Sequence, residues 1–347
     1  MAVSVDIEKK FKGFTLRAAF EAGDETLALL GASGCGKSMT LRCIAGIEKP
    51  DQGRIVLDGV TLFDSEKRID LRPQQRHVGL MFQHYALFPH MTVEQNVSCG
   101  ARATLKKTAL QQAVQDTLTA FGLLELKDRL PSQLSGGQQQ RAALARIMVG
   151  KPGILMLDEP FSALDSHLRF LMEQEVRQLI HRYGKTVLLV SHNRDEVYRL
   201  ADKVAILRDG QIERLGTRDE VFRDPGTRTA CILTGCKNVS AIRRLDDGHA
   251  EALDWGIVLS VPLKSDTCAL GIRMHSVQPG PGENAFLCRV EEVIENPFSF
   301  TVMLHPQEAK TGAAPIGWEM EKPVWERLRS QELTVHFPAQ AILQLRG

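Results

Sequence analysis

Three short runs along the chain are almost entirely apolar. They are TLALL at 26–30, ILML at 154–157 and VLLV at 187–190. Unbroken apolar runs of this length are typical of strands in a parallel sheet that helices cover on both faces. The pattern therefore predicts a parallel core. The segment after each run would lie at the carboxyl edge of the sheet, where such sheets bind ligands.

Helical periodicity appears between and after these runs. From Asp165 to Tyr183 apolar residues recur every three or four positions, which predicts an amphipathic helix packed on the sheet. Helices are also predicted over 39–47, 102–123 and 138–148. The last two would belong to a helical subdomain.

Strands of another kind flank the predicted core. The strand-like stretches 3–11 and 14–20 predict an antiparallel edge, and GRIVLDG at 53–59 predicts a hairpin element with turn signals on both sides. Residues 202–217 predict two further strands joined at Asp209-Gly210, a dipeptide that favours tight hairpin turns. The amino-terminal part is therefore expected to contain a mixed sheet.

A different pattern begins at about residue 236. Short segments that favour β-strands alternate there with the turns DDG, PGPGEN and ENP, which is typical of a small β-barrel. The chain of 347 residues also exceeds the usual size of a single core. We therefore expect an α/β domain over 1–230 and a small all-β barrel over 236–347.

Composition narrows the classes of function. The 43 basic and 42 acidic residues nearly cancel and form no long block of like charge, so no nucleic-acid partner is expected. The seven cysteines form no C-x-x-C pair, which favours reduced thiols in the cytoplasm. Charges interrupt the amino terminus and the apolar runs are short, so we expect neither a signal peptide nor a membrane-spanning segment.

The segment after the first apolar run has the pattern of a phosphate-binding loop, G-x-x-x-x-G-K-S. Its glycines let backbone amides surround phosphates, and the following helix directs its positive end to the same place. We expect Lys37 to bridge the β- and γ-phosphates and Ser38 to ligate Mg²⁺. The residues predicted to surround the nucleotide phosphates are Gly31, Ala32, Ser33, Gly34, Cys35, Gly36, Lys37, Ser38 and Met39.

Two carboxylates follow the second apolar run. Asp158 would emerge at the carboxyl edge of the sheet and hold Mg²⁺, largely through water. Glu159 is placed next to it to polarise an attacking water as a general base. An acidic pair alone would as often be a helix cap, but after a complete phosphate loop the catalytic interpretation is stronger.

Taken in order, these motifs resemble those of the ATP-binding cassette ATPases, and among them the ATPase subunits of importers that depend on a substrate-binding protein. The resemblance covers residues 1 to about 230. It depends on the phosphate loop, the Gln83 of MFQHYALFP, LSGGQ at 134–138, ILMLDEP at 154–160, SALD at 162–165 and SH at 191–192. It implies a P-loop cassette fold, ATP as substrate and Mg²⁺ as its metal.

The resemblance also assigns roles to single residues. His192 would contact the γ-phosphate and hold Glu159, and Gln83 would reach Mg²⁺ or the water and report the γ-phosphate to a transport partner. Asp165 would cross a dimer interface, although an Asp before a long helix is also a good N-cap. Phe11 is the candidate to stack on adenine; Phe14 lies close to it in sequence, and a core position for either ring stays open.

LSGGQ contains no acid, base or strong nucleophile. Ser135, Gly136, Gly137 and Gln138 open a predicted helix and could form an anion site. The resemblance implies a head-to-tail homodimer in which this site closes on the γ-phosphate held by the opposite chain. The simpler interpretation, an ordinary serine N-cap, gives the glycine pair no purpose.

An importer ATPase must also dock on integral-membrane permease subunits. HYALFPHMTV at 84–93 is rich in aromatic residues and is predicted to line the docking groove, with Tyr85 and Phe88 exposed and Phe82 and Leu87 in the core. The chain would then lie at the cytoplasmic face of the membrane as a peripheral subunit. A solute-binding protein would be its indirect partner.

The transported solute is not bound by this subunit. Details of the cassette and the terminal barrel look similar to molybdate importer ATPases, although sulfate or thiosulfate, ferric iron, polyamine and sugar importers have much of the same pattern. The segment GIRMHSVQP at 271–279 resembles the oligosaccharide-binding-like (OB-like) accessory domain of such ATPases. Export ATPases, a non-transport cassette ATPase and a purely regulatory oxyanion-binding protein are the alternatives.

Overall fold

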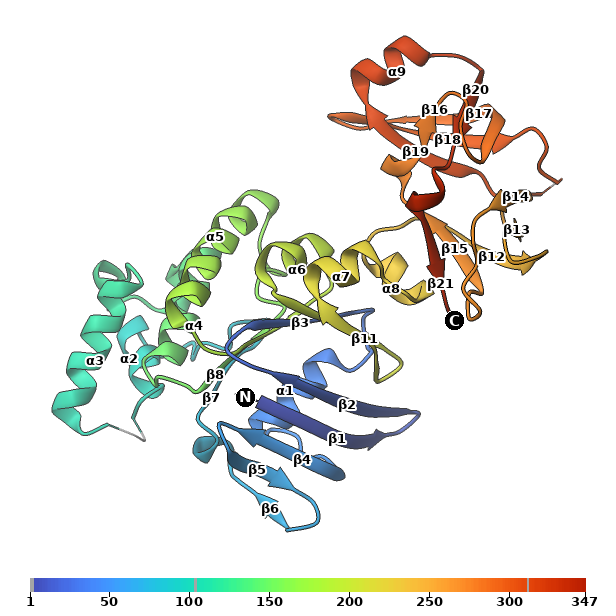
Figure 1. The fold of residues 1–347 in the computed structure, drawn as a ribbon. Helices are drawn as coiled ribbons and strands as arrows, with labels where there is room; N and C mark the ends of the chain where they lie inside the picture. Colours follow the sequence, from blue (N-terminus) through green and yellow to red (C-terminus); the bar gives the residue numbers. More distant parts are fainter. Residues whose placement is uncertain (1–2, 103–104, 311) are drawn as a thin grey trace. The chain divides into compact units, whose positions relative to one another are not determined.

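The computed structural model describes residues 3–102, 105–310 and 312–347. The chain divides into two compact units, Met1–Arg218 and Asp219–Gly347 (Figure 1). The division lies earlier than the boundary expected between 230 and 236. The physical reason is that helix α8 (Arg228–Leu233) belongs to the second unit, where Thr227 bridges to Arg346 and Cys231 packs with Leu345.

The first unit contains a mixed sheet in the order β6-β5-β4-β1-β2-β11-β10-β3-β9-β8-β7. Strands β7, β8, β9, β3 and β10 run parallel, and antiparallel pairs join β10 to β11 and form the β2-β1-β4-β5-β6 edge. The strands are β1 (Val3–Phe11), β2 (Phe14–Ala22), β3 (Thr26–Gly31), β4 (Gln52–Leu57), β5 (Val60–Asp64), β6 (Ile69–Asp70), β7 (Val78–Met81), β8 (Ile154–Asp158), β9 (Val187–Ser191), β10 (Lys203–Arg208) and β11 (Gln211–Thr217).

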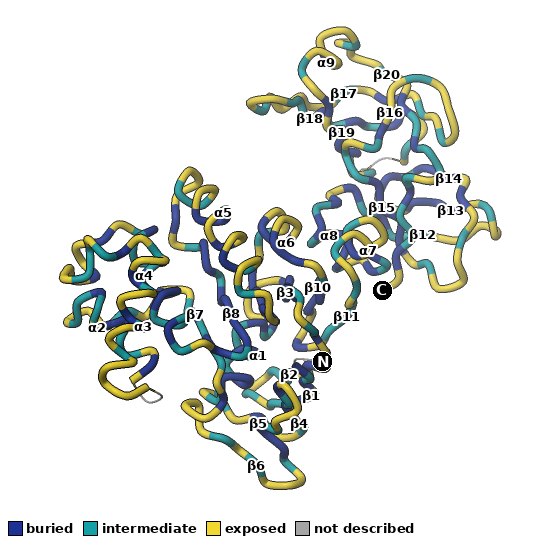
Figure 2. Tube along the Cα trace, turned by 60° about the vertical axis from the view of Figure 1, so that its left-hand side comes forward, coloured by how far each residue is buried: buried dark blue, intermediate teal, exposed yellow. Residues whose placement is uncertain are grey.

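The three apolar runs form the interior strands of the parallel part of the sheet, as predicted. Every residue of β3, β8 and β9 is buried, as Figure 2 shows for this part of the sheet. The predicted hairpin at Asp209-Gly210 is confirmed, since both residues have positive φ, 48° and 81°. The helices that contact this sheet include α1 (Lys37–Ala45) and α6 (Arg194–Leu200).

The helical region has its own apolar core. Helix α2 (Val93–Cys99) packs on α4 (Gly136–Met148), and α3 (Lys107–Ala120) contacts both. The helix expected over 102–123 is observed as the shorter α3. Residues 103 and 104 of the expected range lie outside the described residues. The amphipathic helix is confirmed as α5 (Ser166–Tyr183), which buries Met172, Val176 and Leu179.

The second unit consists mainly of two five-stranded antiparallel sheets, in keeping with the expected OB-like barrel. Their orders are β14-β13-β12-β15-β21 and β16-β20-β17-β18-β19, and they enclose a core that includes Trp255, Trp318 and Phe337. The sequence patterns missed β19, β21 and helix α9. The elements are α7 (Arg218–Arg223), α8, β12 (Asn238–Arg244), β13 (His249–Ala252), β14 (Ile257–Ser260), β15 (Ala269–Ile272), β16 (Gln278–Pro279), β17 (Ala285–Glu295), β18 (Ser299–Pro306), β19 (Ile316–Glu321), α9 (Lys322–Leu328), β20 (Glu332–His336) and β21 (Ile342–Leu345).

The helices of residues 3–102, 105–310 and 312–347 include none with the length and apolar character needed to cross a membrane.

A fully buried arginine fixes the end of helix α1. The Arg76 guanidinium donates to the carbonyl oxygens of Cys43 and Ile44 at 2.8 and 3.0 Å. It also donates to the Leu71 carbonyl oxygen at 2.8 Å and to the Asp70 carboxylate at 2.9 Å. These bonds satisfy carbonyls that the helix end leaves free. They also tie α1, which begins at the phosphate loop, to the segment that leads into β7.

Replacing Arg76 by methionine should lower the free energy of unfolding by about 3–5 kcal/mol, because the carbonyls of Cys43, Ile44 and Leu71 lose the charged donor buried beside them. Urea unfolding followed by circular dichroism measures the change. Arg54→Met is the matched control: Arg54 is 55% exposed in its ion pair with Asp64, so its loss should cost under about 1 kcal/mol. Equal effects of the two substitutions would contradict the role of Arg76.

Candidate functional site

The phosphate loop connects β3 to α1 and depends on glycine at Gly36. Gly34 and Gly36 have φ of 81° and 107°, which side chains disfavour. A Cβ atom at Gly36 would also lie 2.9 Å from Leu16 and 3.1 Å from Phe14. The loop is therefore folded so that its backbone, rather than a side chain, faces the space before helix α1.

Lys37, the first residue of α1, is buried against this loop. Its Nζ donates to the carbonyl oxygens of Gly31 and Ala32 at 2.7 and 2.8 Å, and lies 3.9 Å from the Cys35 Sγ. These contacts hold a positive charge at the loop that is predicted to bind phosphates. Cys35 is itself buried.

Ser38 and Asp158 meet where β8 ends. The Ser38 hydroxyl donates to the Asp158 carboxylate at 2.7 Å. Burial raises the pKa of Asp158, and the Ser38 hydrogen bond and the charges of Arg42 and Lys37 oppose that shift. Hydroxyl and carboxylate oxygens are the ligands that Mg²⁺ prefers, so the two residues fit the metal role predicted for them.

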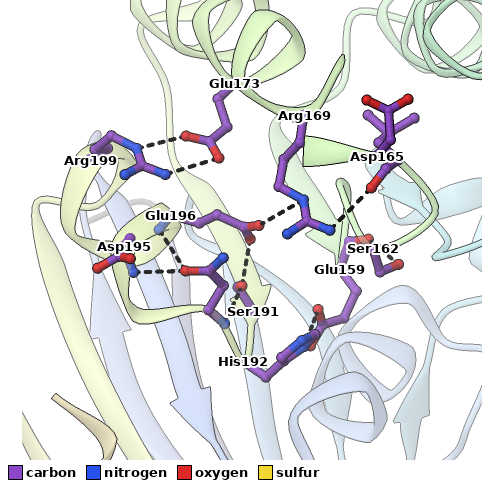
Figure 3. A network of polar contacts seen from close by, with 12 residues as sticks. Glu159, Ser162, Asp165, Arg169, Glu173, Ser191, His192, Asp195, Glu196 and Arg199 are labelled. Carbon is purple, nitrogen blue, oxygen red and sulfur yellow. Dashed lines mark hydrogen bonds and ion pairs between the residues drawn. The ribbon is translucent and has the colours of Figure 1, made fainter. Parts of the chain in front are cut away.

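Glu159 and His192 are brought together from the ends of neighbouring strands. The His192 Nδ1 lies 2.7 Å from the Glu159 Oε2 (Figure 3). Glu159 adopts a positive φ of 49°, a conformation that costs free energy in a non-glycine residue and is found at functional sites. Its backbone N–H donates to the Val190 carbonyl at 2.9 Å, which fixes this turn to β9.

Lys37, Ser38, Glu159 and His192 border one cavity of about 530 Å³, a volume within the range of small-molecule sites. Gln83, which follows β7, also borders it. The predicted phosphate and metal residues that do not line it are Gly31, Ala32, Cys35 and Asp158. The structure therefore brings together most of the residues that the sequence predicts for nucleotide and metal. The lining residues are Phe11, Phe14, Ser33, Gly34, Gly36, Lys37, Ser38, Met39, Gln83, Glu159 and His192.

Two phenylalanines form the aromatic side of the cavity. Phe11 and Phe14 pair across the β1–β2 turn, with ring centroids 6.0 Å apart and planes 30° from parallel. The Phe14 ring lies directly under the backbone of Gly36 and Gly210, which confines it. Phe11 and Phe14 both line the cavity and both are half-buried, so Phe11 stays the predicted adenine-stacking residue, with Phe14 packed beside it.

The signature residues do not border this cavity. Ser135 caps helix α4: its hydroxyl accepts from the Gln138 N–H at 3.4 Å, while the Gln138 Oε1 accepts from the Ser135 N–H at 3.0 Å. Asp165 is likewise an N-cap, which accepts from the N–H groups of His167 and Leu168 at 3.0 and 2.9 Å. The polar groups of Ser135 and Asp165 thus have a local structural use.

The glycine pair of the signature also has a packing role that the sequence did not reveal. A Cβ atom at Gly137 would lie 2.9 Å from Met172 Sδ, and one at Gly136 would lie 3.1 Å from Leu164 Cδ2. The two glycines therefore let the start of α4 approach α5 and the turn before it. The expectation that an N-cap alone leaves them without a purpose is wrong.

A second cavity of about 570 Å³ lies beside the segment after Gln83, and Phe88, Cys99 and Arg146 are among its lining residues. Phe88 is 46% exposed, as predicted, and its ring lies 5.5 Å from the Arg146 guanidinium. The prediction of an exposed Tyr85 is wrong, because its side chain is buried. Tyr85 and Ala86 both have positive φ, and Arg146 binds both carbonyls, so the turn folds Tyr85 inward.

Known proteins resemble the chain in sequence. A family model described as ABC transporter matches residues 17–162. A sulfate/thiosulfate import ATP-binding protein of Chromobacterium violaceum is 40% identical over 277 residues, which cover 78% of this chain and 73% of the relative. A putrescine transport ATP-binding protein of Escherichia coli is 44% identical over 239 residues, 69% of this chain and 60% of the relative. A spermidine/putrescine import ATP-binding protein of Lawsonia intracellularis is 44% identical over 205 residues, 59% of this chain and 54% of the relative.

Solved structures agree with these relatives. The ATP-binding cassette MJ0796, a dimer in a post-hydrolysis state bound to ADP and Pi, superposes with a TM-score of 0.53 at 26% identity, over 63% of this chain and 99% of that chain. The protein cbiO1 from Clostridium perfringens, part of an ABC transporter complex, has a TM-score of 0.54 at 27% identity. The match covers 65% of this chain and 91% of that chain. The chain belongs to the ABC transporter family, as an ATP-binding cassette subunit. The alignments to the two polyamine relatives span only a little more than half of their length.

Asp158→Asn tests whether the buried carboxylate is kept for metal binding. Burial disfavours the charged form of Asp158. Without nucleotide, the free energy of unfolding of the variant should therefore equal that of the parent or be about 1 kcal/mol higher. Stabilisation by Mg·ATP, about 2.7 kcal/mol at a hundredfold excess over Kd, should be lost. Thermal unfolding with and without Mg·ATP measures both effects. Undiminished stabilisation by Mg·ATP in the variant would contradict the metal role.

Proposed function

We propose that the chain hydrolyses ATP as a head-to-tail homodimer and drives solute import through permease subunits in the membrane. The observation that carries this proposal is the division of the nucleotide motifs. One cavity gathers the phosphate loop, Glu159, His192 and Gln83, whereas the signature residues Ser135–Gln138 lie outside it. A second chain would supply that missing side.

Each residue at the cavity has a distinct task in this reaction. The loop amides and Lys37 bind the phosphates and stabilise the charge that develops on the transferring phosphoryl group. Ser38 and Asp158 would hold Mg²⁺, which would supply positive charge to neutralise the phosphates. Glu159 orients the attacking water as a general base, and His192 holds Glu159 through the 2.7 Å contact.

The signature completes the site from the partner subunit. Gly136 and Gly137 are the first two residues of α4, so their backbone N–H groups belong to the amides that a helix start leaves free for an anion. The dimeric, ADP- and Pi-bound state of a structural neighbour supports this arrangement. Closure on ATP and opening after hydrolysis would supply the movement that drives transport.

Glu159→Gln should lower kcat for ATP hydrolysis by at least about 100-fold, because the amide cannot accept a proton from water. The affinity of this variant for ATP should equal that of the parent, since the phosphate loop is unchanged. The variant should then form a dimer in ATP and Mg²⁺, which sedimentation velocity detects. Ser135→Arg serves as the comparison: it should retain ATP binding and fail to dimerise. Full hydrolysis by a strictly monomeric parent chain would contradict the proposal.

The second cavity is the proposed permease-docking groove. Exposed Phe88 offers an apolar side chain, and Arg146 provides a cation beside the groove. The groove is lined by residues on both sides of Gln83 in the sequence, Phe82 before it and Ala86 after it, so an occupant would lie next to a residue that senses the nucleotide. This location supports a peripheral subunit at the cytoplasmic face of the membrane, with a solute-binding protein as an indirect partner.

For the solute we propose a tetrahedral oxyanion. Molybdate is the expectation from the sequence, and the sulfate/thiosulfate relative belongs to the same chemical class. Its alignment of 277 residues is longer than the 218 residues of the first unit, so it extends into the second unit. The Escherichia coli putrescine alignment of 239 residues exceeds the first unit by 21 residues, against 59 residues for the sulfate/thiosulfate relative, and the Lawsonia polyamine alignment of 205 residues is shorter than the first unit. Polyamine import is the second candidate, because two polyamine relatives are 44% identical in the aligned part.

Uptake by cells decides between these solutes. Cells with this gene deleted should lose uptake of labelled molybdate or sulfate and keep uptake of labelled spermidine, and the parent gene should restore the loss. Genes carrying Glu159→Gln or Phe88→Ala should not restore uptake. The first variant lacks the general base for ATP hydrolysis, and the second lacks an apolar side chain of the docking groove. Thermal unfolding of both purified variants provides the control for folding. Loss of spermidine uptake alone would replace the oxyanion by a polyamine.

A further inference from the structure

A buried carboxylate supports the turn that carries His192. Glu196, in helix α6, is 4% exposed and accepts a hydrogen bond from the Ser191 Oγ at 2.7 Å (Figure 3). The same Ser191 oxygen accepts from the Asn193 N–H at 2.9 Å. Glu196 therefore holds the 191–193 turn from helix α6, and it is not among the residues that line the nucleotide cavity.

The other carboxylate oxygen of Glu196 faces Arg169 of helix α5. The Arg169 Nε lies 3.9 Å from the Glu196 Oε1 (Figure 3). The Arg169 Nη2 donates to the Leu164 carbonyl at 3.1 Å. Leu164 directly precedes Asp165, the residue expected at the dimer interface. Arg169 thus connects Glu196 to the 162–165 turn.

The 162–165 turn is itself bonded to the catalytic carboxylate residue. The Ser162 N–H and hydroxyl both donate to the Glu159 carbonyl, at 3.3 and 3.0 Å. Together with the Glu159–His192 contact, these bonds form a closed ring of interactions around the catalytic base. The ring passes through Glu159, His192, Ser191, Glu196, Arg169, Leu164 and Ser162.

The weakest part of this ring is the pair of Arg169 and Glu196. Their closest atoms are too far apart for a hydrogen bond, and the buried Arg169 Nε has no hydrogen-bond partner among the described residues. A buried donor beside a buried carboxylate gains from even a small approach. A movement of the 162–165 turn therefore has a direct route to the turn of His192.

We propose that Glu196 is a positioning residue that, with Arg169, fixes the His192 turn relative to the 162–165 turn. Contact of Asp165 with the partner subunit would then orient Glu159 through this ring. The inference rests on the proposed function, hydrolysis of ATP in a head-to-tail dimer. Glu196 itself touches neither nucleotide nor water in this role.

A neighbouring ion pair offers a matched control. Arg199 of α6 binds Glu173 of α5 with two hydrogen bonds, of 2.7 and 3.0 Å, and Glu173 is 3% exposed. This pair joins the same two helices as Arg169 and Glu196. In the described part of the chain its hydrogen bonds reach neither the 162–165 turn nor the 191–193 turn. Glu173→Gln therefore reports on the packing of these two helices without breaking a hydrogen bond of the ring.

Steady-state ATP hydrolysis by the full chain tests the proposal. Glu196→Gln, which retains the shape and an acceptor for Ser191, should lower kcat about tenfold and leave KM for ATP unchanged. Arg169→Met should have a similar effect, and the double variant should be no slower than the slower single variant. Ser191→Ala breaks the ring because it removes the hydroxyl that donates to Glu196, and it should also lower kcat. Glu173→Gln should retain the parent kcat.

The outcomes separate this inference from the function on which it rests. A parent chain that hydrolyses no ATP contradicts the proposed function. With an active parent, three results would overturn the positioning role: parental kcat in both Glu196→Gln and Ser191→Ala, independent effects of Glu196 and Arg169 in the double variant, or an equal loss in Glu173→Gln. Thermal unfolding of each variant verifies that the protein is folded.

Discussion

The parallel pairing of β3, β9 and β8 is the constraint on which the candidate site depends. Parallel strands point the same way, so the polar segments that follow them emerge at one edge of the sheet. The phosphate loop follows β3, Asp158 ends β8, and Ser191 ends β9. Three segments far apart in sequence therefore meet at one cavity, because each strand is buried and its register is fixed by hydrogen bonds to its neighbours.

Burial on both sides of this sheet makes the polar groups at its edge costly, and each has a partner that offsets the cost. Lys37 binds loop carbonyls, Ser38 binds Asp158, and Glu159 binds His192. Such pairs can exchange partners when phosphate and a cation enter. The same chemistry recurs behind the site, where Glu196 lies between Ser191 and Arg169.

The motifs that face a partner have two uses at once. Ser135 and Asp165 cap helices, and the glycines beside Ser135 let α4 approach α5, yet neither cap borders the chain's own cavity. Family membership and the structural role are therefore compatible explanations of the same residues. A helix start that is capped and close-packed is also a rigid surface, which suits a site completed only on association.

The sequence by itself determined the strands of the core, the phosphate loop and the two carboxylates at the end of β8, because each depends on a local pattern of residues. The tertiary structure alone decided the positions that depend on packing between distant segments. Tyr85 is buried because Arg146, sixty-one residues later, holds its turn. Helix α8 joins the second unit because Thr227 pairs near the chain end at Arg346. The link from Glu196 to Arg169 joins two helices whose approach no local pattern encodes.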